Sequence, residues 1–224
     1  RKDHASVVLS DDTIVIMGGE SRLSSGTRHT LASVYASSDK GKTWTLTGSL
    51  PKAIMGHEAV ALSDDSIVVM GGHFFNAVVP VTREYYSHVF KSDDQGENWT
   101  TVSDDSQSEW SNRAWHTSVA LADDTIVLLS GRNCYNSFYG TRVWNDIYRS
   151  TDGGATWDQI GGAPWSGRSG HSSVALPDSS IVLFGGNVGD LENDVWRSAD
   201  WGETWTQMTP TAAWSPRYAE SVLL

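Results

Sequence analysis

Four copies of one pattern of hydrophobic and polar positions fill most of the chain. Each copy opens with a histidine followed by a run in which apolar and small or polar residues alternate, as on a half-buried β-strand. The four histidines stand 53, 59 and 55 residues apart. The opening runs are HASVVL (4–9), HEAVAL (57–62), HTSVAL (116–121) and HSSVAL (171–176).

Three further elements follow in the same order in every copy. An acidic turn leads into a continuous apolar, β-branched run, which predicts a strand buried on both faces. A variable loop, a short third strand and a tight turn come next, and a fourth strand opens on a tryptophan. The second runs are IVIMGG (14–19), IVVMGG (67–72), IVLLSG (126–131) and IVLFGG (181–186), and the third are VYAS (34–37), VFKS (89–92), IYRS (147–150) and VWRS (195–198).

Four short antiparallel strands in each repeat of about 50 residues predict an all-β fold, a β-propeller of four-stranded blades. We expect one domain over residues 1–224, with blades at 1–50, 51–109, 110–164 and 165–213 and the first strand of a fifth at 214–224. Four blades and one strand do not close a ring, which favours part of a larger propeller. The alternative is a complete small propeller with an irregular closing strand.

The repeat resembles two known families. The R-x-x-H start, the Gly-Gly after an apolar strand and the later Asp-Val and Trp are similar to kelch repeats, as in the propeller of galactose-oxidase-like proteins. The turn before strand four resembles an Asp box, S-x-D-x-G-x-T-W. The four copies are SSDKGKTW (37–44), SDDQGENW (92–99), STDGGATW (150–157) and SADWGETW (198–205).

The Asp box has the chemistry of a folding device. Its aspartate can accept hydrogen bonds from backbone N–H groups of the turn, its glycine can take positive φ, and its tryptophan can fold under the hairpin. We therefore expect a structural role for Asp39, Gly41, Trp44, Asp94, Gly96, Trp99, Asp152, Gly154, Trp157, Asp200, Gly202 and Trp205.

The loops after strands two and four share the face opposite the Asp boxes, because alternate strands run in opposite directions. Three loops after strand two are long, which is typical of functional loops. Their arginines and aromatics suit stacking on sugars or docking of a protein, although the aromatics could instead pack on each other. The candidate ligand-binding residues are Arg28, His29, Phe74, Phe75, Arg83, Tyr85, Tyr86, Tyr135, Phe138, Tyr139, Arg142 and Trp144.

A Trp-Ser-x-Arg unit enters strand one on this same face, at 110–113, 165–168 and 214–217, and Arg1 holds the equivalent arginine position. The second repeat departs from it, with Pro51 and Ile54 in place of Trp and Arg. Repetition favours a staple in which the arginine bonds loop carbonyls. The alternative is a ring of arginines that attracts an anionic ligand.

Charge and composition narrow the function. The net charge of −11, from 16 basic and 27 acidic residues, argues against nucleic acid and against an anionic membrane surface. No run is long and apolar enough for a membrane span. The single cysteine, Cys134, cannot form an intrachain disulfide. No spacing of metal ligands stands out, so neither a metal nor another cofactor is expected, and the sequence does not indicate an oligomeric state.

These observations favour a non-enzymatic scaffold that recognises a protein or a glycan through its long loops, with no catalytic residue assigned. The alternative is a carbohydrate-active enzyme whose catalytic groups lie partly outside this segment. Galactose-oxidase-like chemistry needs a His pair that does not accompany Cys134, Tyr135 and Tyr139, and sialidase-like hydrolysis needs a Tyr–Glu pair and an acid Asp. The Asp boxes imply an extracellular or cell-surface location, and Asn98, in the sequon NWT, is a candidate glycosylation site.

Overall fold

The protein is all-β, and its four repeats form four-stranded antiparallel propeller blades. The computed structural model describes residues 1–22, 26–76, 82–134 and 140–218. No helix occurs among these described residues, and none of them forms a helix of the length and apolarity that would cross a membrane. The chain divides into two compact units, residues 1–114 with 153–155 and residues 115–152 with 156–224.

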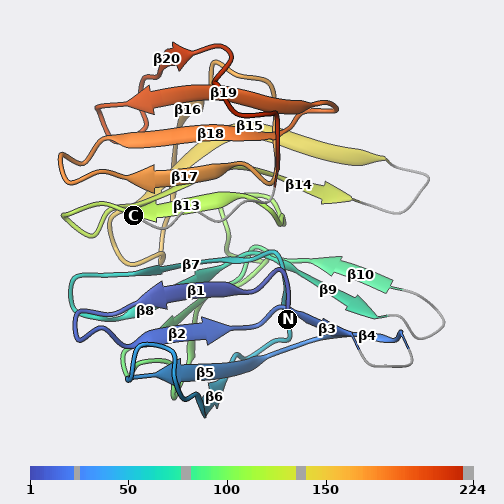
Figure 1. The fold of residues 1–224 in the computed structure, drawn as a ribbon, viewed down its shortest axis with the longest axis vertical. Coiled ribbons are helices and arrows are strands. Elements are labelled where there is room, and N and C mark those ends of the chain that lie inside the picture. Colours follow the sequence, from blue (N-terminus) through green and yellow to red (C-terminus); the bar gives the residue numbers. More distant parts are fainter. Residues whose placement is uncertain (23–25, 77–81, 135–139, 219–224) are drawn as a thin grey trace. The chain divides into compact units, whose positions relative to one another are not determined.

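The first unit holds two blades and a further sheet (Figure 1). Strands one of the two blades, β1 and β7, contact each other. Blade 1 has the order β1 (Ala5–Val8), β2 (Ile14–Met17), β5 (Ser33–Ser37) and β6 (Thr45–Ser49), and blade 2 has the order β7 (Glu58–Ala61), β8 (Ile67–Met70), β11 (Val89–Ser92) and β12 (Thr100–Ser103).

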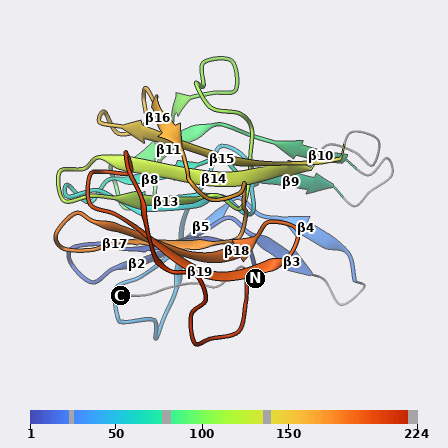
Figure 2. The same cartoon turned by 90° about the horizontal axis from the view of Figure 1, so that it is seen from above.

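The further sheet of this unit comes from segments that the sequence predicts as irregular loops. After strand two, each blade forms a hairpin, and the two hairpins pair through His29 and Asn76 into one antiparallel sheet, which we call the loop sheet. Figure 2 shows it at the right, beyond the ends of the blade strands. Its order is β10 (Thr82–Tyr85), β9 (His73–Asn76), β4 (Arg28–Thr30) and β3 (Glu20–Arg22).

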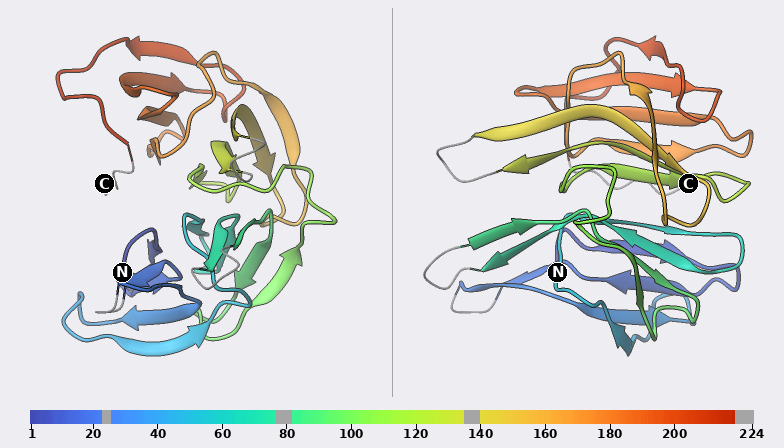
Figure 3. Two further views of the ribbon diagram at one scale, coloured as in Figure 1. Left: turned by 90° about the vertical axis from the view of Figure 1, so that its right-hand side faces the viewer. Right: turned by 180° about the vertical axis from the view of Figure 1, so that it is seen from behind.

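The second unit holds blades 3 and 4, whose first strands also contact each other (Figure 3). Here strands two and three run on past a bulge, so the long loop of blade 3 begins as a strand extension. The strands are β13 (Thr117–Ala120), β14 (Ile126–Cys134), β15 (Thr141–Ser150) and β16 (Asp158–Gly162) in blade 3, and β17 (Ser172–Ala175), β18 (Ile181–Asn187), β19 (Leu191–Ser198) and β20 (Thr206–Thr209) in blade 4.

The core of each unit lies between its two blades, because a single blade cannot cover its own faces. Strands two supply much of it, as their continuous apolar runs predict. In the first unit it includes Val15, Met17, Val34, Ile67 and Val69, and in the second Val127, Leu129, Ile147, Ile181 and Leu183.

Within each unit the second blade's Asp box is inserted against the first blade. A Cβ built on Gly96 of blade 2 would lie 3.0 Å from Val34 Cγ1, and one on Gly202 of blade 4 would lie 3.3 Å from Val127 Cγ1. Both glycines have positive φ, +90° and +91°. Glycine is therefore required at this position for two reasons: the backbone has positive φ, and the neighbouring blade leaves no room for a side chain.

The histidines that open strands one of blades 2 and 4 are buried. Burial lowers the pKa of His57 to about 3, and the nearby His4 lowers it further. Burial likewise lowers the pKa of His171 to about 3, with the charge of Arg168 acting in the same direction. The neutral ring of His171 places Nε2 2.9 Å from Thr117 Oγ1 of blade 3. These histidines serve as polar core residues.

Gly96→Ala is expected to destabilise the protein more than Gly41→Ala. Both positions have positive φ, +90° and +83°, so each alanine should cost about 1–2 kcal/mol of backbone strain. Only the Gly96 variant also meets a neighbouring blade, because the nearest atom to a Cβ at Gly41 is Trp44 Cζ2 at 4.0 Å. Overpacking should add about 1–3 kcal/mol. Urea unfolding of dilute protein measures both, and equal losses would contradict the packing argument.

Protonation of the two buried histidines should oppose folding as pH falls, whereas Glu58, whose pKa burial raises to about 8, gains its proton first in the folded state and acts in the opposite direction. His57 and His171 have folded pKa values of about 3, whereas a histidine in the unfolded chain titrates near 6.5. At each of these histidines the unfolded state binds more protons between these values, so each lowers the free energy of unfolding by up to about 1.4 kcal/mol per pH unit as pH drops. Urea unfolding at pH 7.5 and 5.5 measures the change in stability. His171→Gln removes the contribution of one histidine, so its stability at pH 5.5 relative to pH 7.5 should be about 1.4 kcal/mol more favourable than that of the unaltered protein. The exposed His29→Gln should match the unaltered protein, and an equal change in all three proteins would refute the assignment.

Candidate functional site

All four Asp boxes build the same turn. In blade 1 the Asp39 carboxylate accepts hydrogen bonds from Thr43 N (2.8 Å) and Thr43 Oγ1 (2.6 Å), which lower the pKa of Asp39 to about 2. Trp44 Nε1 donates to Gly41 O at 3.2 Å. The box glycines have positive φ, as expected. The carboxylates of the box aspartates accept hydrogen bonds from within the turn. Burial of the box tryptophans differs from blade to blade: Trp157 is buried and Trp99 and Trp205 are half-buried, whereas Trp44 is 39% exposed.

Asn98 takes the place of the threonine found in the other boxes. Its backbone N–H and its side-chain amide both donate to Asp94, each at 2.8 Å. The amide thus donates the hydrogen bond that the threonine hydroxyl donates in the other boxes. The hydrogen-bonding needs of the box account for a polar side chain here. The same amide nitrogen would carry a glycan if the sequon were used.

The Trp-Ser-x-Arg unit joins neighbouring blades through its backbone. In the second unit Gly131 N of blade 3 donates to Arg168 O at 2.9 Å, and Arg168 N donates to Trp144 O at 3.0 Å. The same pair of bonds forms at Ile54, where Gly19 N donates to Ile54 O at 2.8 Å and Ile54 N donates to Leu31 O at 3.1 Å. The joint does not depend on arginine, because the backbone groups make it in blade 2 as well.

The arginine side chain adds a buried ion pair. Arg168 Nη1 donates to Gly185 O and to Asp194 Oδ1, both at 2.7 Å, and Nη2 donates to Asp194 Oδ2 at 2.8 Å. Although burial alone would raise the pKa of Asp194, hydrogen bonds from Arg168 and Trp196 hold it below its usual value. The staple interpretation predicts a bond to a loop carbonyl, whereas Gly185 lies within β18.

Blade 2 lacks both partners of this pair. Strand alignment puts His88 at the position of Asp194, just as it puts Ile54 at that of Arg168. A single exchange would leave a buried charge unpaired, so the two exchanges belong together. Asp105 lies beside His88, with 2.9 Å between Asp105 Oδ1 and His88 Nδ1, and it also accepts from Ser87 N at 2.7 Å.

The end of the loop sheet nearest the blades is a packed aromatic layer. His73 is buried and stacks on Tyr85, with ring centroids 5.1 Å apart, and Phe74 packs against the core of the unit. Tyr85 and Tyr86 are each only 7% exposed. Tyr85 and Tyr86 are therefore not displayed for direct ligand contact, because these rings hold the hairpins on the blades, whereas Phe74 is half-buried.

The residues of the loop sheet further from the blades are exposed or half-buried. Arg83 is exposed and its guanidinium carbon lies 5.2 Å from the centroid of the Phe75 ring. Thr30 ties the two hairpins together, since its Oγ1 accepts from Phe75 N and donates to Phe75 O. His29 is exposed on β4 beside them. This surface of Phe75, Arg83 and His29 is the candidate site of the first unit.

Arg28 has a different role from the one expected. Its Nη1 lies 3.6 Å from Oε2 of the buried Glu20, and Lys2 Nζ lies 3.5 Å from Glu20 Oε1. The buried carboxylate needs these cations, so Arg28 anchors β4. The sequence analysis did not single out Glu20 or Thr30; the position of Glu20 directly after Gly18 and Gly19 is the signal that could have marked it.

The second unit has its own arginine–aromatic pairs, on the extension of β14 and β15. Arg142 lies over Trp144 at 5.7 Å, and Arg132 lies over Trp115 at 4.4 Å. Neither Arg132 nor Trp115 is among the residues predicted from sequence. Tyr135, Phe138 and Tyr139 lie outside the described residues.

Tyr86 and Glu84 form the Tyr–Glu pair that a sialidase-like reaction would need, with Tyr86 Oη donating to Glu84 Oε2 at 2.8 Å. Burial and this hydrogen bond raise the pKa of Tyr86 well above its usual value. Tyr86 is only 7% exposed, so its ring is not displayed to a substrate.

Comparison with known proteins agrees with this geometry. The family model of the KLHDC2/KLHL20/DRC7 Kelch-repeats domain matches residues 3–224. The chain belongs to the kelch-repeat family. The solved structure titled "Structure of YjhT" has a TM-score of 0.71 at 16% identity and covers 97% of this kelch chain, which spans 68% of that structure. At this identity the likeness shows the fold.

Two groups of xyloglucanases are distant relatives. Xyloglucanase Xgh74A of Acetivibrio thermocellus is 27% identical over 132 residues, which is 57% of this kelch chain and 14% of that enzyme. A xyloglucanase of Paenibacillus sp is 28% identical over 136 residues, 60% of this chain and 12% of that enzyme. The chain therefore spans a small part of the curated relatives that it matches.

Arg168→Ala should cost about 3–5 kcal/mol of stability, because Asp194 is left buried without its counter-ion. The double variant Arg168→Ile with Asp194→His copies the arrangement of Ile54 and His88 in blade 2 and should recover part of the loss. A double-mutant cycle by urea unfolding measures the coupling. Additive losses from the two positions would contradict the pairing.

Proposed function

We propose that this kelch domain is a binding module that engages a protein or a glycan through the loops following strand two. The observation that carries the proposal is the pairing of arginines with aromatic rings on these loops: Arg83 with Phe75 in the first unit, and Arg142 with Trp144 in the second. An arginine beside an aromatic ring offers a flat apolar surface together with fixed hydrogen-bond donors, which suits a sugar ring or a protein side chain.

Strand pairing in the loops supports this function. Arg83 and Phe75 face each other across β10 and β9, and Arg142 faces Asn133 across β15 and β14. Side chains on paired strands lose less conformational entropy on binding than side chains on free loops. The loops are thus suited to hold ligand-contacting groups in place before a ligand arrives.

A second candidate, a carbohydrate-active enzyme, is favoured by the likeness to xyloglucanases over 57–60% of the chain. We propose it only for a larger assembly, because this chain spans 14% or less of those enzymes. Tyr86 is unsuited to be its nucleophile, so its catalytic groups would come from elsewhere. We also propose an extracellular or cell-surface location for this kelch domain, with Asn98 as the glycan acceptor.

Phe75→Ala and Arg83→Ala should each weaken ligand binding about tenfold or more, which corresponds to about 1.4 kcal/mol. The probes are arrayed glycans that include xyloglucan oligosaccharides, sialosides and galactosides, and a matched set of arrayed peptides. Titration calorimetry on any hit gives the dissociation constants. Arg83 is exposed and Phe75 is half-buried, so unfolding midpoints near that of the unaltered protein are needed to verify that both variants fold.

Lys91→Ala is the matched control, because it removes a cation from the opposite end of blade 2, where Lys91 pairs with Asp93. It should bind as the unaltered protein does. If the Phe75 and Arg83 variants also bind normally, the loop sheet is not the site. Release of sugars from xyloglucan by the purified chain would instead support the enzyme.

A further inference from the structure

Three arginines lie on one face of the loop sheet. Arg22 lies directly opposite Arg28 on β3 and β4. Arg83 lies directly opposite Phe75 on β10 and β9. Directly opposite side chains point to the same face of a sheet, and the pairing of the two hairpins puts Arg28 and Phe75 on a common face. We call the surface formed by these four side chains the arginine face.

The pair of Arg22 and Arg28 is unfavourable for folding by itself, because like charges directly opposite each other destabilise a sheet. The buried Glu20 offsets only part of this charge. Its carboxylate lies 3.6 Å from Arg28 Nη1 and 3.5 Å from Lys2 Nζ, so it is shared between two cations. An anion bound between the two arginines would remove the remaining repulsion.

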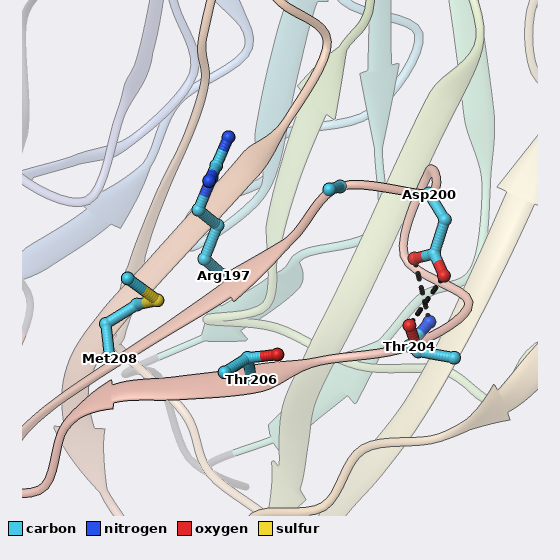
Figure 4. Close-up of a pocket in the computed structure, with 6 residues that line it drawn as sticks. Arg197, Asp200, Thr204, Thr206 and Met208 are labelled. Carbon is cyan, nitrogen blue, oxygen red and sulfur yellow. Dashed lines mark hydrogen bonds between the residues drawn. The ribbon is translucent and has the colours of Figure 1, made fainter.

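Cations on the blades, such as Arg197 and Lys91, lie beside acidic residues. Arg197, which lines a pocket of about 310 Å³ on blade 4 (Figure 4), pairs with Asp178 at 2.9 Å. Lys91 lies 2.9 Å from a neighbouring carboxylate. Arg22 and Arg83 are exposed, and neither has a carboxylate within ion-pair distance in the part of the chain that the structure describes. Both guanidinium groups are therefore available to a ligand.

The charge of the whole chain limits what this face can hold. The arginine face is a small positive area on a chain whose net charge is −11. A densely charged polyanion that reached beyond the face would be repelled by the rest of the chain. A single carboxylate is instead well matched, because a guanidinium group can bind it through two parallel hydrogen bonds. The ligand is therefore expected to carry few, separated carboxylates.

Phe75 adds an apolar surface beside these charges. Its ring is half-buried, and the Arg83 guanidinium carbon lies 5.2 Å from the ring centroid, an arrangement that suits a sugar ring. An extended peptide would instead bind at a sheet edge, where it needs free backbone groups. At the β3 edge the backbone N and O of Glu20 already bond to Lys2, at 2.8 and 3.0 Å. The face thus favours a carboxylated sugar over an acidic peptide.

We propose that the arginine face binds the carboxylates of an acidic glycan, one that contains uronic acid residues. Arg22 and Arg28 hold one carboxylate between them, Phe75 packs against a sugar ring, and Arg83 donates to the neighbouring sugar. This inference rests on the proposed function, because it narrows the ligand of the loop sheet to one chemical class.

Titration calorimetry with trigalacturonate, in about 20 mM salt so that charges are weakly screened, tests the proposal. Trigalacturonate should bind, and its methyl ester, which keeps the sugar rings without the charges, should bind at least about tenfold more weakly. Arg22→Gln should weaken binding of trigalacturonate about fivefold or more, because the carboxylate loses one of two cations. The unfolding midpoint of the unliganded Arg22→Gln variant should stay unchanged or rise, since the like-charge pair is gone. A lower midpoint would assign Arg22 a structural role and count against the proposal.

Lys40→Gln is the matched control, because it removes one exposed positive charge from the Asp box of blade 1. The chain itself shows that glutamine fits there: Gln95 holds the same position in blade 2, with φ of +58° against +60° for Lys40. This variant should bind trigalacturonate as the unaltered protein does. An equal loss in Lys40→Gln and Arg22→Gln would mean that net charge alone governs binding, which would overturn the proposal.

Three further results would overturn the acidic-glycan proposal. They are no binding of trigalacturonate up to about 5 mM, equal binding of the acid and its methyl ester, and tighter binding of a triglutamate peptide than of trigalacturonate. The proposed binding function would survive each of them if a neutral glycan or a peptide bound and Phe75→Ala weakened that binding. Failure of every probe to depend on Phe75 would overturn both.

Discussion

A blade in this protein is a thin sheet whose two faces are both apolar, so it is stable only when a neighbour covers it. The Asp box is the element that makes this covering tight. Its carboxylate binds the turn's own backbone, which leaves the glycine free to approach the next sheet without a side chain. The contacts of Gly96 with Val34 and of Gly202 with Val127 show the result in two separate places. The remaining structure depends on this approach.

The joints between blades combine three kinds of interaction. Backbone hydrogen bonds at Arg168 and Ile54 fix where the next blade begins. The same bonds form whether the side chain at this position is arginine or isoleucine. Buried histidines such as His171 fill the space beside them in the neutral form. The Arg168–Asp194 pair is present in blade 4, whereas blade 2 has neither charge. Desolvation explains why blade 2 lacks both, because one buried charge without the other is more costly than an apolar substitute.

The loops on the opposite face build on this frame. Residues close to the blades, among them Tyr85, Tyr86 and Glu20, are buried and hold the hairpins, whereas further out Phe75 is half-buried and Arg83 is exposed. A scaffold that repeats along the chain thus carries surfaces that differ from blade to blade. The proposed binding function rests on these differences, and the family likeness supplies the scaffold alone.

The sequence by itself determined the fold class, the strands of each blade and the chemistry of the Asp box, because these follow from local periodicity and from hydrogen bonds within eight residues. It also predicted that the repeated arginine serves as a staple. Only the tertiary structure decided which loop residues are accessible. The pairing of His29 with Asn76, which builds the loop sheet, joins residues 47 positions apart, and no local pattern marks it. No local pattern marks the burial of Tyr85 and Tyr86 either, since a side chain's exposure depends on what the rest of the chain places over it.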